Sequence, residues 1–171
     1  MGLLFQPRWT TGRPGRAPTA GGAELPDRGA VFSLALDAVL RGDASRFADV
    51  FSDDVVVASP QYVVAGLASV QRALGSPEES LADIELLVTG LDAFDERVIG
   101  EWCLEARFTR PIVWDDSLLL EPTGGEVRML GASFAEFRGN RIRAFRHYFD
   151  DSALLAGVPG APSHLRWRTG S

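Results

Sequence analysis

Residues 126–149 read EVRMLGASFAEFRGNRIRAFRHYF, and this stretch decides the fold. On both sides of Arg138-Gly139-Asn140 the apolar and polar residues alternate with a period of two, which is the pattern of strands that bury one face. The glycine and the asparagine accept the positive φ that a tight hairpin demands. The stretch therefore predicts two long antiparallel strands, over residues 126–137 and 141–149.

The period of two extends upstream, over residues 83–94 and 97–109, which join around Asp95-Glu96. Before Pro77 the apolar spacing is mostly three to four, which is typical of helices. Helices followed by a long antiparallel meander predict an α+β domain, with the helices on one face of a curved sheet. The expected earlier elements are a helix over residues 31–40 between Asp27 and Gly42, a short helix from Asp43 to Phe51, strands over 55–58 and 62–65, and a helix from Ala68 to Leu74.

The chain has 171 residues, 46% of them hydrophobic, which is the size and composition of one globular domain. Residues 1–27 and 157–171 are rich in Pro and Gly and have no periodicity, so both are expected to be irregular or disordered tails. The domain is therefore predicted over residues 28–156, with Asp150 capping a last short helix over 152–156.

Scarce residue types exclude several kinds of chemistry. All 17 cationic residues are arginine, and without lysine there is no Schiff-base enzyme, no pyridoxal aldimine and no Walker A phosphate loop. A single cysteine, Cys103, excludes a disulfide within the chain. Together with His147 and His164 it gives too few and too scattered ligands for a usual zinc site. We therefore expect no metal site.

Charge and hydropathy limit the partners. The net charge is −6, and the acidic excess lies between residues 30 and 156, so the domain lacks the cationic footprint that a nucleic acid needs. No stretch approaches the roughly 20 apolar residues of a membrane span, and the apolar run at the N-terminus is too short for a secretory signal. We expect a cytoplasmic protein with no nucleic-acid and no membrane partner.

Alternation assigns faces to the long strands. In the strand over 97–109, the apolar set should face the helices, and the set with Glu101, Glu105 and Arg107 should face solvent or a second subunit. In the last strand, Arg143 and His147 should share a face with two phenylalanines. The apolar set comprises Val98, Gly100, Trp102, Leu104, Ala106 and Phe108, and the last-strand pair of phenylalanines comprises Phe145 and Phe149.

His147 is the candidate catalytic residue. An imidazole between apolar neighbours loses its charge easily and can serve as a neutral base near pH 7. A histidine on a half-apolar strand is also commonly a packed residue with one hydrogen bond, so a structural role stays open. Ser133 or Glu136, on the neighbouring arm of the hairpin, is the candidate polar partner of His147, and the sequence leaves open which of the two faces inward.

The ordered set of elements resembles the SnoaL-like branch of the nuclear transport factor 2 fold over roughly residues 28–160. The segments that carry the resemblance are Phe51-Ser52-Asp53-Asp54-Val55-Val56-Val57, Gly139-Asn140-Arg141-Ile142 and Tyr148-Phe149-Asp150. The resemblance implies a cone of helices closed on a curved sheet around an apolar pocket, usually a dimer through the outer sheet face. Similar members include polyketide cyclases that perform an aldol closure, limonene-type epoxide hydrolases, ketosteroid isomerases and non-catalytic proteins, and the catalytic kinds need no cofactor.

The chain departs from the family pattern at its catalytic positions. The resemblance places the acid/base aspartate of the cyclases at His147, and it places the arginine and second aspartate of the epoxide hydrolases near Trp102 and Leu104. The polar residues that hold the hydrolytic water fall near Val57 and Ser59. Epoxide hydrolysis is therefore disfavoured, and His147 becomes the expected proton shuttle.

Two functions remain open at this point. The first is a cofactor-free cyclase or isomerase acting on an apolar, carbonyl-rich small molecule, in which His147 opens into the pocket and moves the proton. Ser59, Gln61 or Tyr62 would then donate hydrogen bonds to the developing enolate. The second is a non-catalytic small-molecule-binding or dimerising module that uses the same walls and needs no base. The expected pocket walls are Trp102, Phe108, Trp114, Met129, Phe134 and Phe145.

Overall fold

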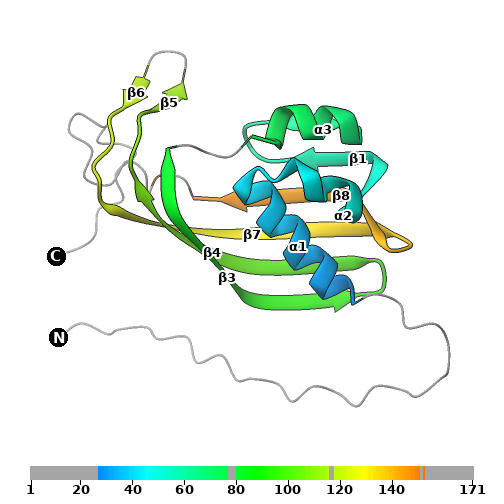
Figure 1. Cartoon of the computed structure of the whole chain (residues 1–171). Helices are drawn as coiled ribbons and strands as arrows, with labels where there is room; N and C mark the ends of the chain where they lie inside the picture. Colours follow the sequence, from blue (N-terminus) through cyan, green and yellow to red (C-terminus); the bar gives the residue numbers. More distant parts are fainter. Residues whose placement is uncertain (1–26, 77–79, 116–117, 151, 153–171) are drawn as a thin grey trace, which may run out of the picture.

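The computed structural model describes residues 27–76, 80–115, 118–150 and 152 (Figure 1). Residues 1–26 and 157–171 of the predicted tails, and all of the last short helix except Ser152, lie outside the described residues. The described chain begins with helices and continues with long strands, as predicted. The elements are α1 (Arg28–Arg41), the 3-10 helix η1 (Ala44–Arg46), α2 (Phe47–Val50), β1 (Phe51–Ala58), β2 (Val63–Ala65), α3 (Leu67–Leu74), β3 (Leu81–Phe94), β4 (Arg97–Phe108), β5 (Ile112–Asp115), β6 (Leu118–Leu120), β7 (Glu126–Arg138) and β8 (Arg141–Phe149).

Six strands form one curved sheet in the order β2-β1-β8-β7-β4-β3, and β5 and β6 form a separate hairpin. The predicted meander of β3, β4, β7 and β8 is confirmed, with antiparallel pairing throughout. One pairing differs from the expected antiparallel sheet, because β1 and β8 run parallel. After β2 the chain passes through α3 to the far edge of the sheet, so the meander returns to β1 with its last strand pointing the same way (Figure 1).

The caps predicted for the first helix are present. The Asp27 side chain accepts a hydrogen bond from the backbone N–H of Gly29, which satisfies one of the free donors of the first turn. Gly42 ends the helix with φ 65°, a left-handed conformation that glycine adopts without strain. Helix α1 thereby lies between the two predicted caps, Asp27 and Gly42.

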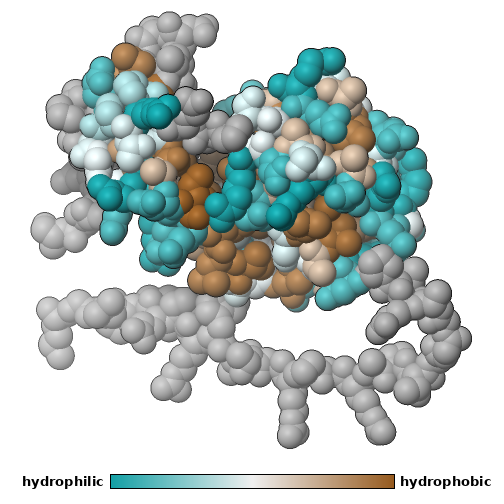
Figure 2. All heavy atoms as spheres, in the orientation of Figure 1, coloured by the Kyte–Doolittle hydropathy of each residue, from teal (hydrophilic) through white to brown (hydrophobic). Residues whose placement is uncertain are grey.

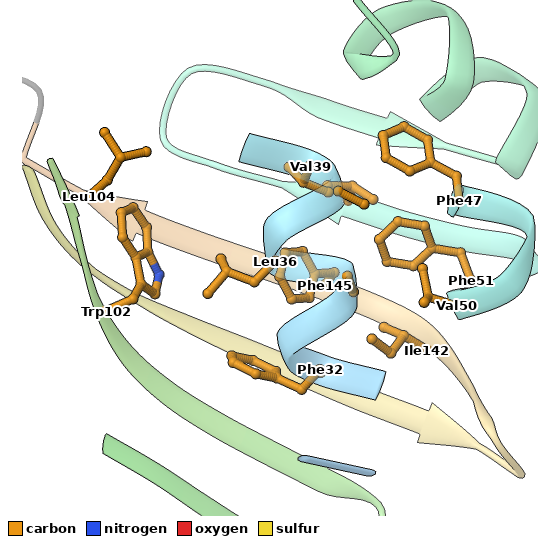
Figure 3. Packing of buried hydrophobic residues seen from close by; sticks show 14 of the residues in the cluster. Phe32, Leu36, Val39, Phe47, Val50, Phe51, Trp102, Leu104, Ile142 and Phe145 are labelled. Carbon is orange, nitrogen blue, oxygen red and sulfur yellow. The ribbon is translucent and has the colours of Figure 1, made fainter. Parts of the chain in front are cut away.

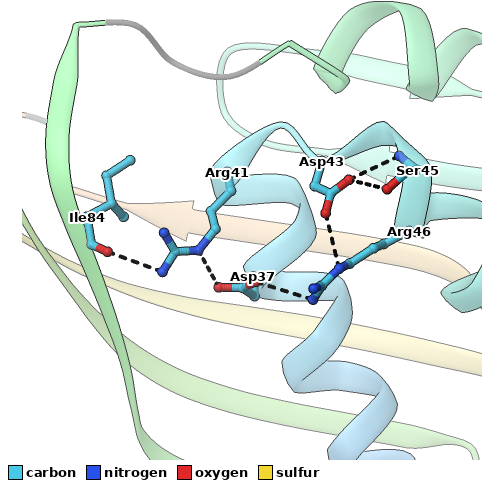
Figure 4. A network of polar contacts seen from close by, with 6 residues as sticks. All are labelled: Asp37, Arg41, Asp43, Ser45, Arg46 and Ile84. Atoms are coloured by element: carbon cyan, nitrogen blue, oxygen red, sulfur yellow. Dashed lines mark hydrogen bonds and ion pairs between the residues drawn. The ribbon is translucent and has the colours of Figure 1, made fainter.

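A polar network fixes α1 against the edge strand β3 (Figure 4). The guanidinium of Arg41 donates to Asp37 at 2.7 Å and to the backbone carbonyl of Ile84 at 3.1 Å. Arg46 joins the same network through ion pairs with Asp37 and Asp43. All of these groups are partly exposed, so the network sets the position of the helix more than it adds stability.

Two segments differ from the sequence predictions. Strand β1 begins at Phe51 and not at Val55, because the short helix ends one residue earlier and Phe51 is already extended. The β5–β6 hairpin was not predicted, since Pro111 interrupts the period of two and the three leucines of β6 do not alternate with polar residues.

The main sheet has an inner face, which the helices cover, and an outer face opposite to it. Trp102 and Phe108 on the inner face of β4 are almost fully buried, while Glu101 and Arg107 on the outer face are exposed, as predicted. Cys103 is the exception on the outer face, since it is buried and its Sγ accepts a hydrogen bond from Arg128 Nε at 3.1 Å. The two faces thus have different chemistry along the same strands.

A β-bulge changes the predicted faces of the last strand. Glu136 pairs with Ala144 and Phe137 with Ile142, so Arg143 is an extra residue on β8. Ile142 is therefore buried and Arg143 exposed, and the predicted grouping of Arg143 with His147 is wrong. Beyond the bulge the alternation resumes, with His147 on the inner face.

The core lies between α1, α2 and the inner face, and aromatic side chains form its centre (Figure 3). The ring of Phe145 lies 5.9 Å from those of both Phe32 and Phe51. Hydrophobic side chains also reach the surface along the edge strand β3 (Figure 2), where Leu87 and Phe94 are exposed. No helix in the described residues is long and apolar enough to cross a membrane.

Candidate functional site

His147 lies on the inner face of β8, opposite Ser133 of β7. Its side chain is only 2% exposed. The ring lies between two phenylalanines of its own strand, with centroids 5.8 Å from Phe145 and 5.6 Å from Phe149. The predicted opening of this side chain into a pocket is therefore not met in this conformation, since aromatic rings surround the imidazole.

The hydrogen-bond partner of His147 is Tyr62, whose hydroxyl oxygen lies 2.5 Å from Nε2. Tyr62 is in the turn between β1 and β2, which the backbone N–H of Ser59 closes by donating to the Tyr62 carbonyl at 2.8 Å. The parallel pairing of β1 with β8 brings this turn to His147, because Ala58 lies beside Arg146. Two residues that are 85 positions apart thus form one polar pair.

Both partners predicted for His147 are otherwise engaged. The hydroxyl of Ser133 accepts a hydrogen bond from Trp102 Nε1 at 2.9 Å. Glu136 lies on the outer face, where Arg143 and Arg146 donate to its carboxylate at 2.9 and 2.7 Å. The prediction that one of them pairs with His147 is wrong, because Glu136 lies on the opposite face and Ser133 serves the indole.

Burial keeps both members of the pair neutral at pH 7. It lowers the pKa of His147 to about 4, because the charged imidazolium loses its hydration inside the aromatic core. It also raises the pKa of Tyr62 to about 12, although a hydrogen bond with Ser59 acts in the opposite direction. A neutral imidazole has one nitrogen that donates and one that accepts, so taking up a further proton at the accepting nitrogen converts the ring to a cation.

One nitrogen of the imidazole has no partner. Nδ1 of His147 is buried and makes no hydrogen bond with any residue that the structure describes. Buried polar atoms in native proteins are nearly always paired, so an unpaired one calls for an explanation. The site therefore offers one fixed and one unused nitrogen on the same ring.

The predicted wall residues fall into two groups. Trp102, Phe108, Met129 and Phe145 are buried on the inner face. Phe134 lies on the outer face, with its ring 5.9 Å from Tyr148, so it is no wall of an inner pocket. The alternation of β7 explains this, because Phe134 lies one residue from the inward-facing Ser133.

Three further residues were predicted to belong to the site. Ser59 and Gln61 lie in the turn beside Tyr62, and the Ser59 hydroxyl donates to Gln61 Oε1 at 3.0 Å. Trp114 belongs to β5, and its side chain lies outside the described part of the structure. Phe149 was not among the predicted walls, yet its ring links His147 to Trp102, 6.2 Å away.

A hollow of about 540 Å³ lies elsewhere, on the outer face near the start of β7. Charged side chains line it, among them Glu105, Arg107 and Arg128. This lining does not suit the apolar ligand that the sequence predicts. Within the described residues, no group of three or more His, Cys, Asp or Glu side chains is arranged to hold a metal ion.

Helices on one face of a curved six-stranded sheet define a cone-shaped α+β domain of the nuclear transport factor 2-like class. The sequence agrees with this assignment. Residues 34–145 match the model of the SnoaL-like domain, and the chain belongs to this family.

Solved structures share the fold at low sequence identity. A candidate polyketide cyclase from Acidithiobacillus ferrooxidans is 16% identical with a TM-score of 0.65, covering 81% of this chain and 99% of its own. AclR, a candidate hydroxylase from Streptomyces galilaeus, is 20% identical with a TM-score of 0.62, covering 78% and 96%. A protein of ketosteroid isomerase-like fold from Catenulispora acidiphila is 13% identical with a TM-score of 0.59, covering 80% and 95%. No curated protein sequence matches the chain significantly.

Proposed function

We propose that this protein is a cofactor-independent cyclase or isomerase in which His147 takes a proton from an apolar, carbonyl-containing small molecule and returns it. The observation that carries the proposal is the arrangement of one imidazole with Nε2 bound by Tyr62 and Nδ1 unpaired. The family match and the neighbour described as a candidate polyketide cyclase support an aldol-type polyketide cyclisation.

The energetics of the site favour a chemical role over a packing role. An unpaired polar atom in a core costs about 1–3 kcal/mol, and a phenylalanine would fill the space between Phe145 and Phe149 without that cost. Native proteins accept such local costs mainly at functional sites. A group that must pick up a proton during a reaction needs its nitrogen unpaired beforehand.

The proposed reaction needs only proton and electron-pair movements. The imidazole nitrogen takes a proton from a carbon next to a carbonyl, and the C–H electron pair moves to form an enolate. In a cyclase the enolate carbon attacks a second carbonyl of the same molecule, a C–C bond forms, and the imidazolium returns the proton to the new alkoxide. In an isomerase the imidazolium returns the proton to another carbon of the enolate system.

The low basicity of His147 sets the type of substrate. With a pKa of about 4 the imidazole is a weak base, so it suits carbon acids that two flanking carbonyls already make acidic. The same low pKa makes the imidazolium a strong acid that returns its proton rapidly. Poly-β-ketone chains and β-diketones fit this requirement.

The test measures exchange of the acidic protons of a β-diketone, such as 1-phenyl-1,3-butanedione, for deuterium by NMR. We expect His147→Gln to slow the protein-catalysed exchange by about 10²-fold or more, the usual size of a general-base contribution. Tyr148→Phe, a change one residue away on the outer face, is the matched control and should leave exchange unchanged. Exchange at the wild-type rate in His147→Gln would contradict the proposal.

The pH profile gives an independent check. Only the neutral imidazole accepts a proton, so catalysed exchange should be level near pH 7 and should decrease as the pH falls through about 4. A decrease centred near pH 6.5 would indicate that the catalytic group is an exposed histidine and not the buried one.

A non-catalytic binding protein is the second candidate, and the 2% exposure of His147 favours it. In that case the wild-type protein binds an apolar polyketone, detected through Trp fluorescence, but does not accelerate exchange. His147→Gln should then bind the same compound with little change. The two candidates therefore differ in the exchange rate of the wild-type protein itself.

A further inference from the structure

The two nitrogens of His147 are not equivalent, and the structure allows two neutral forms of the ring. In the first form Nδ1 carries the proton and Tyr62 donates its hydroxyl hydrogen to Nε2. In the second form Nε2 carries the proton and donates it to the Tyr62 oxygen. The 2.5 Å separation of Nε2 and the hydroxyl fits either direction.

The buried Nδ1 distinguishes the two forms. In the first form Nδ1–H is a buried donor without an acceptor among the described residues. Orphaned buried N–H groups are rare in proteins, whereas incompletely satisfied acceptors are less so. The second form leaves only a lone pair unpaired and uses the single N–H of the ring.

We propose that Tyr62 is a positioning residue that accepts the Nε2 hydrogen of His147 and thereby holds the ring in the form whose Nδ1 lone pair receives the proton. The catalytic meaning of this inference rests on the proposed function, but the form of the ring is a property of the free protein.

Among the described groups that face His147, Tyr62 is the one placed to accept the Nε2 hydrogen. Tyr62 comes from the turn between β1 and β2, and Ser133 comes from β7, where its hydroxyl is bonded to Trp102. Phe145 and Phe149 of its own strand offer no titratable group. Burial accounts for the lowered pKa of His147.

The test reads the proton position directly. Protein labelled with ¹⁵N-histidine gives two-bond ¹H–¹⁵N correlation spectra in which protonated and unprotonated ring nitrogens have distinct shifts. The chain has only two histidines, so His147→Gln assigns the signals. At pH 7 we expect His147 with Nε2 protonated and Nδ1 unprotonated. A spectrum with Nδ1 protonated would overturn the inference.

Tyr62→Phe tests the dependence on Tyr62. It removes the acceptor and leaves neither ring nitrogen with a partner among the described residues, so the Nε2-protonated form should lose its advantage and a signal of the Nδ1-protonated form should appear beside it. Tyr148→Phe should leave the spectrum unchanged. An unchanged His147 spectrum in Tyr62→Phe would overturn the inference. If Tyr62→Phe does not fold, 3-fluorotyrosine in the Tyr148→Phe background labels Tyr62 alone, since the chain has two tyrosines. The weaker acceptor should then move the Nε2 hydrogen resonance upfield, and no movement would overturn the inference.

Measurements of the exchange rate distinguish this inference from the proposed function. Tyr62→Phe should lower kcat of the exchange reaction by up to about tenfold with KM nearly unchanged, because His147 remains but its Nδ1 carries the proton in part of the molecules. If His147→Gln leaves exchange unaffected while the spectra show the expected proton position, the proposed function fails and the positioning stands. If His147→Gln abolishes exchange while Tyr62→Phe changes neither kcat nor the spectrum, the positioning fails and the proposed function stands.

Discussion

The inner and outer faces of the sheet are made by the same strands and have opposite chemistry. On the inner face, Trp102 and Phe145 are buried, and His147 with its partner Tyr62 forms the polar exception. On the outer face, Glu101, Glu105 and Arg107 alternate with the inward-facing residues of β4 and remain exposed. Neighbouring residues of a strand thus lie on opposite faces of the sheet, one in the core and the next at the surface.

The comparison shows where a polar group has a large effect. The carboxylates and guanidiniums of the outer face form exposed ion pairs. In one of them the side chain of Glu105 is 60% exposed and that of Arg128 is 67% exposed, so water screens their attraction. On the inner face, burial alone moves the pKa of His147 to about 4. The inner face should therefore respond strongly to single substitutions and to pH, and the outer face weakly.

The largest difference between the faces should come from removing a large side chain. Trp102→Ala removes a residue that is 1% exposed and leaves Ser133 without its donor, so we expect a loss of about 4 kcal/mol in the free energy of unfolding. Leu130→Ala removes a 59% exposed side chain of the outer face and should cost less than about 0.5 kcal/mol. Urea unfolding followed by circular dichroism measures both, and similar losses would contradict the division into faces.

The second difference concerns pH. The folded pKa of His147, about 4, lies below its ordinary value of 6.5, so the unfolded chain binds a proton that the folded chain does not between these values. The free energy of unfolding should therefore decrease by up to about 3 kcal/mol as the pH falls from 6.5 to 4, and His147 should add no pH dependence above that range. His147→Gln removes this contribution. Denaturant unfolding at pH 7 and pH 4.5 gives the difference, and identical pH dependence in both proteins would refute it.

The third difference uses two glycines as a matched pair. A Cβ on Gly131 would lie 2.2 Å from the Trp102 ring, which is too buried to move away, so Gly131→Ala should destabilise the protein by about 1–3 kcal/mol. A Cβ on Gly90 would meet Glu101 only at 3.5 Å or more, in ordinary contact. Gly90→Ala should leave the midpoint of thermal unfolding nearly unchanged, and an equal decrease for both variants would show that the inner face is not tightly packed there.

The smallest expected effect on stability comes from a substitution that tests whether the outer face is an interface between two copies of the chain. We propose that this face pairs two copies of the chain, because Leu130 and Tyr148 are 59% and 49% exposed on it. Leu130→Arg should then convert dimers to monomers in sedimentation at tens of micromolar while changing the unfolding of the monomer by less than about 0.5 kcal/mol. A wild-type protein that sediments only as a monomer would remove the proposal.

Local sequence signals predicted most of the fold. The Asp27 and Gly42 caps, the turn at Gly139 and the long strands follow from rules that act over a few residues. The bulge at Arg143 could not be predicted, because the register of the partner strand decides which residue is extra. Alternation therefore assigned the faces of β4 correctly and those of early β8 incorrectly.

The candidate site was only half predictable. His147 stood out because it lies between phenylalanines on one strand, a pattern that the sequence contains directly. Its partner Tyr62 was named only as a pocket donor, because nothing local indicates that β1 and β8 run side by side in parallel. Phe134 was assigned to the wrong face for a simpler reason, since aromatic character does not reveal which side of a strand a residue occupies.

The central place of β8 has a consequence for how the chain folds. This last strand inserts between β7 and β1, so the helices with β1 and β2 have no sheet partner in the rest of the domain until β8 has been synthesised. Closing contacts between such distant segments slows folding, because the loop entropy is lost before the contacts form. The Tyr62–His147 pair spans 85 residues and belongs to these late contacts. We therefore expect a ribosome-bound chain that ends before residue 141 to lack both the completed sheet and the Tyr62–His147 pair.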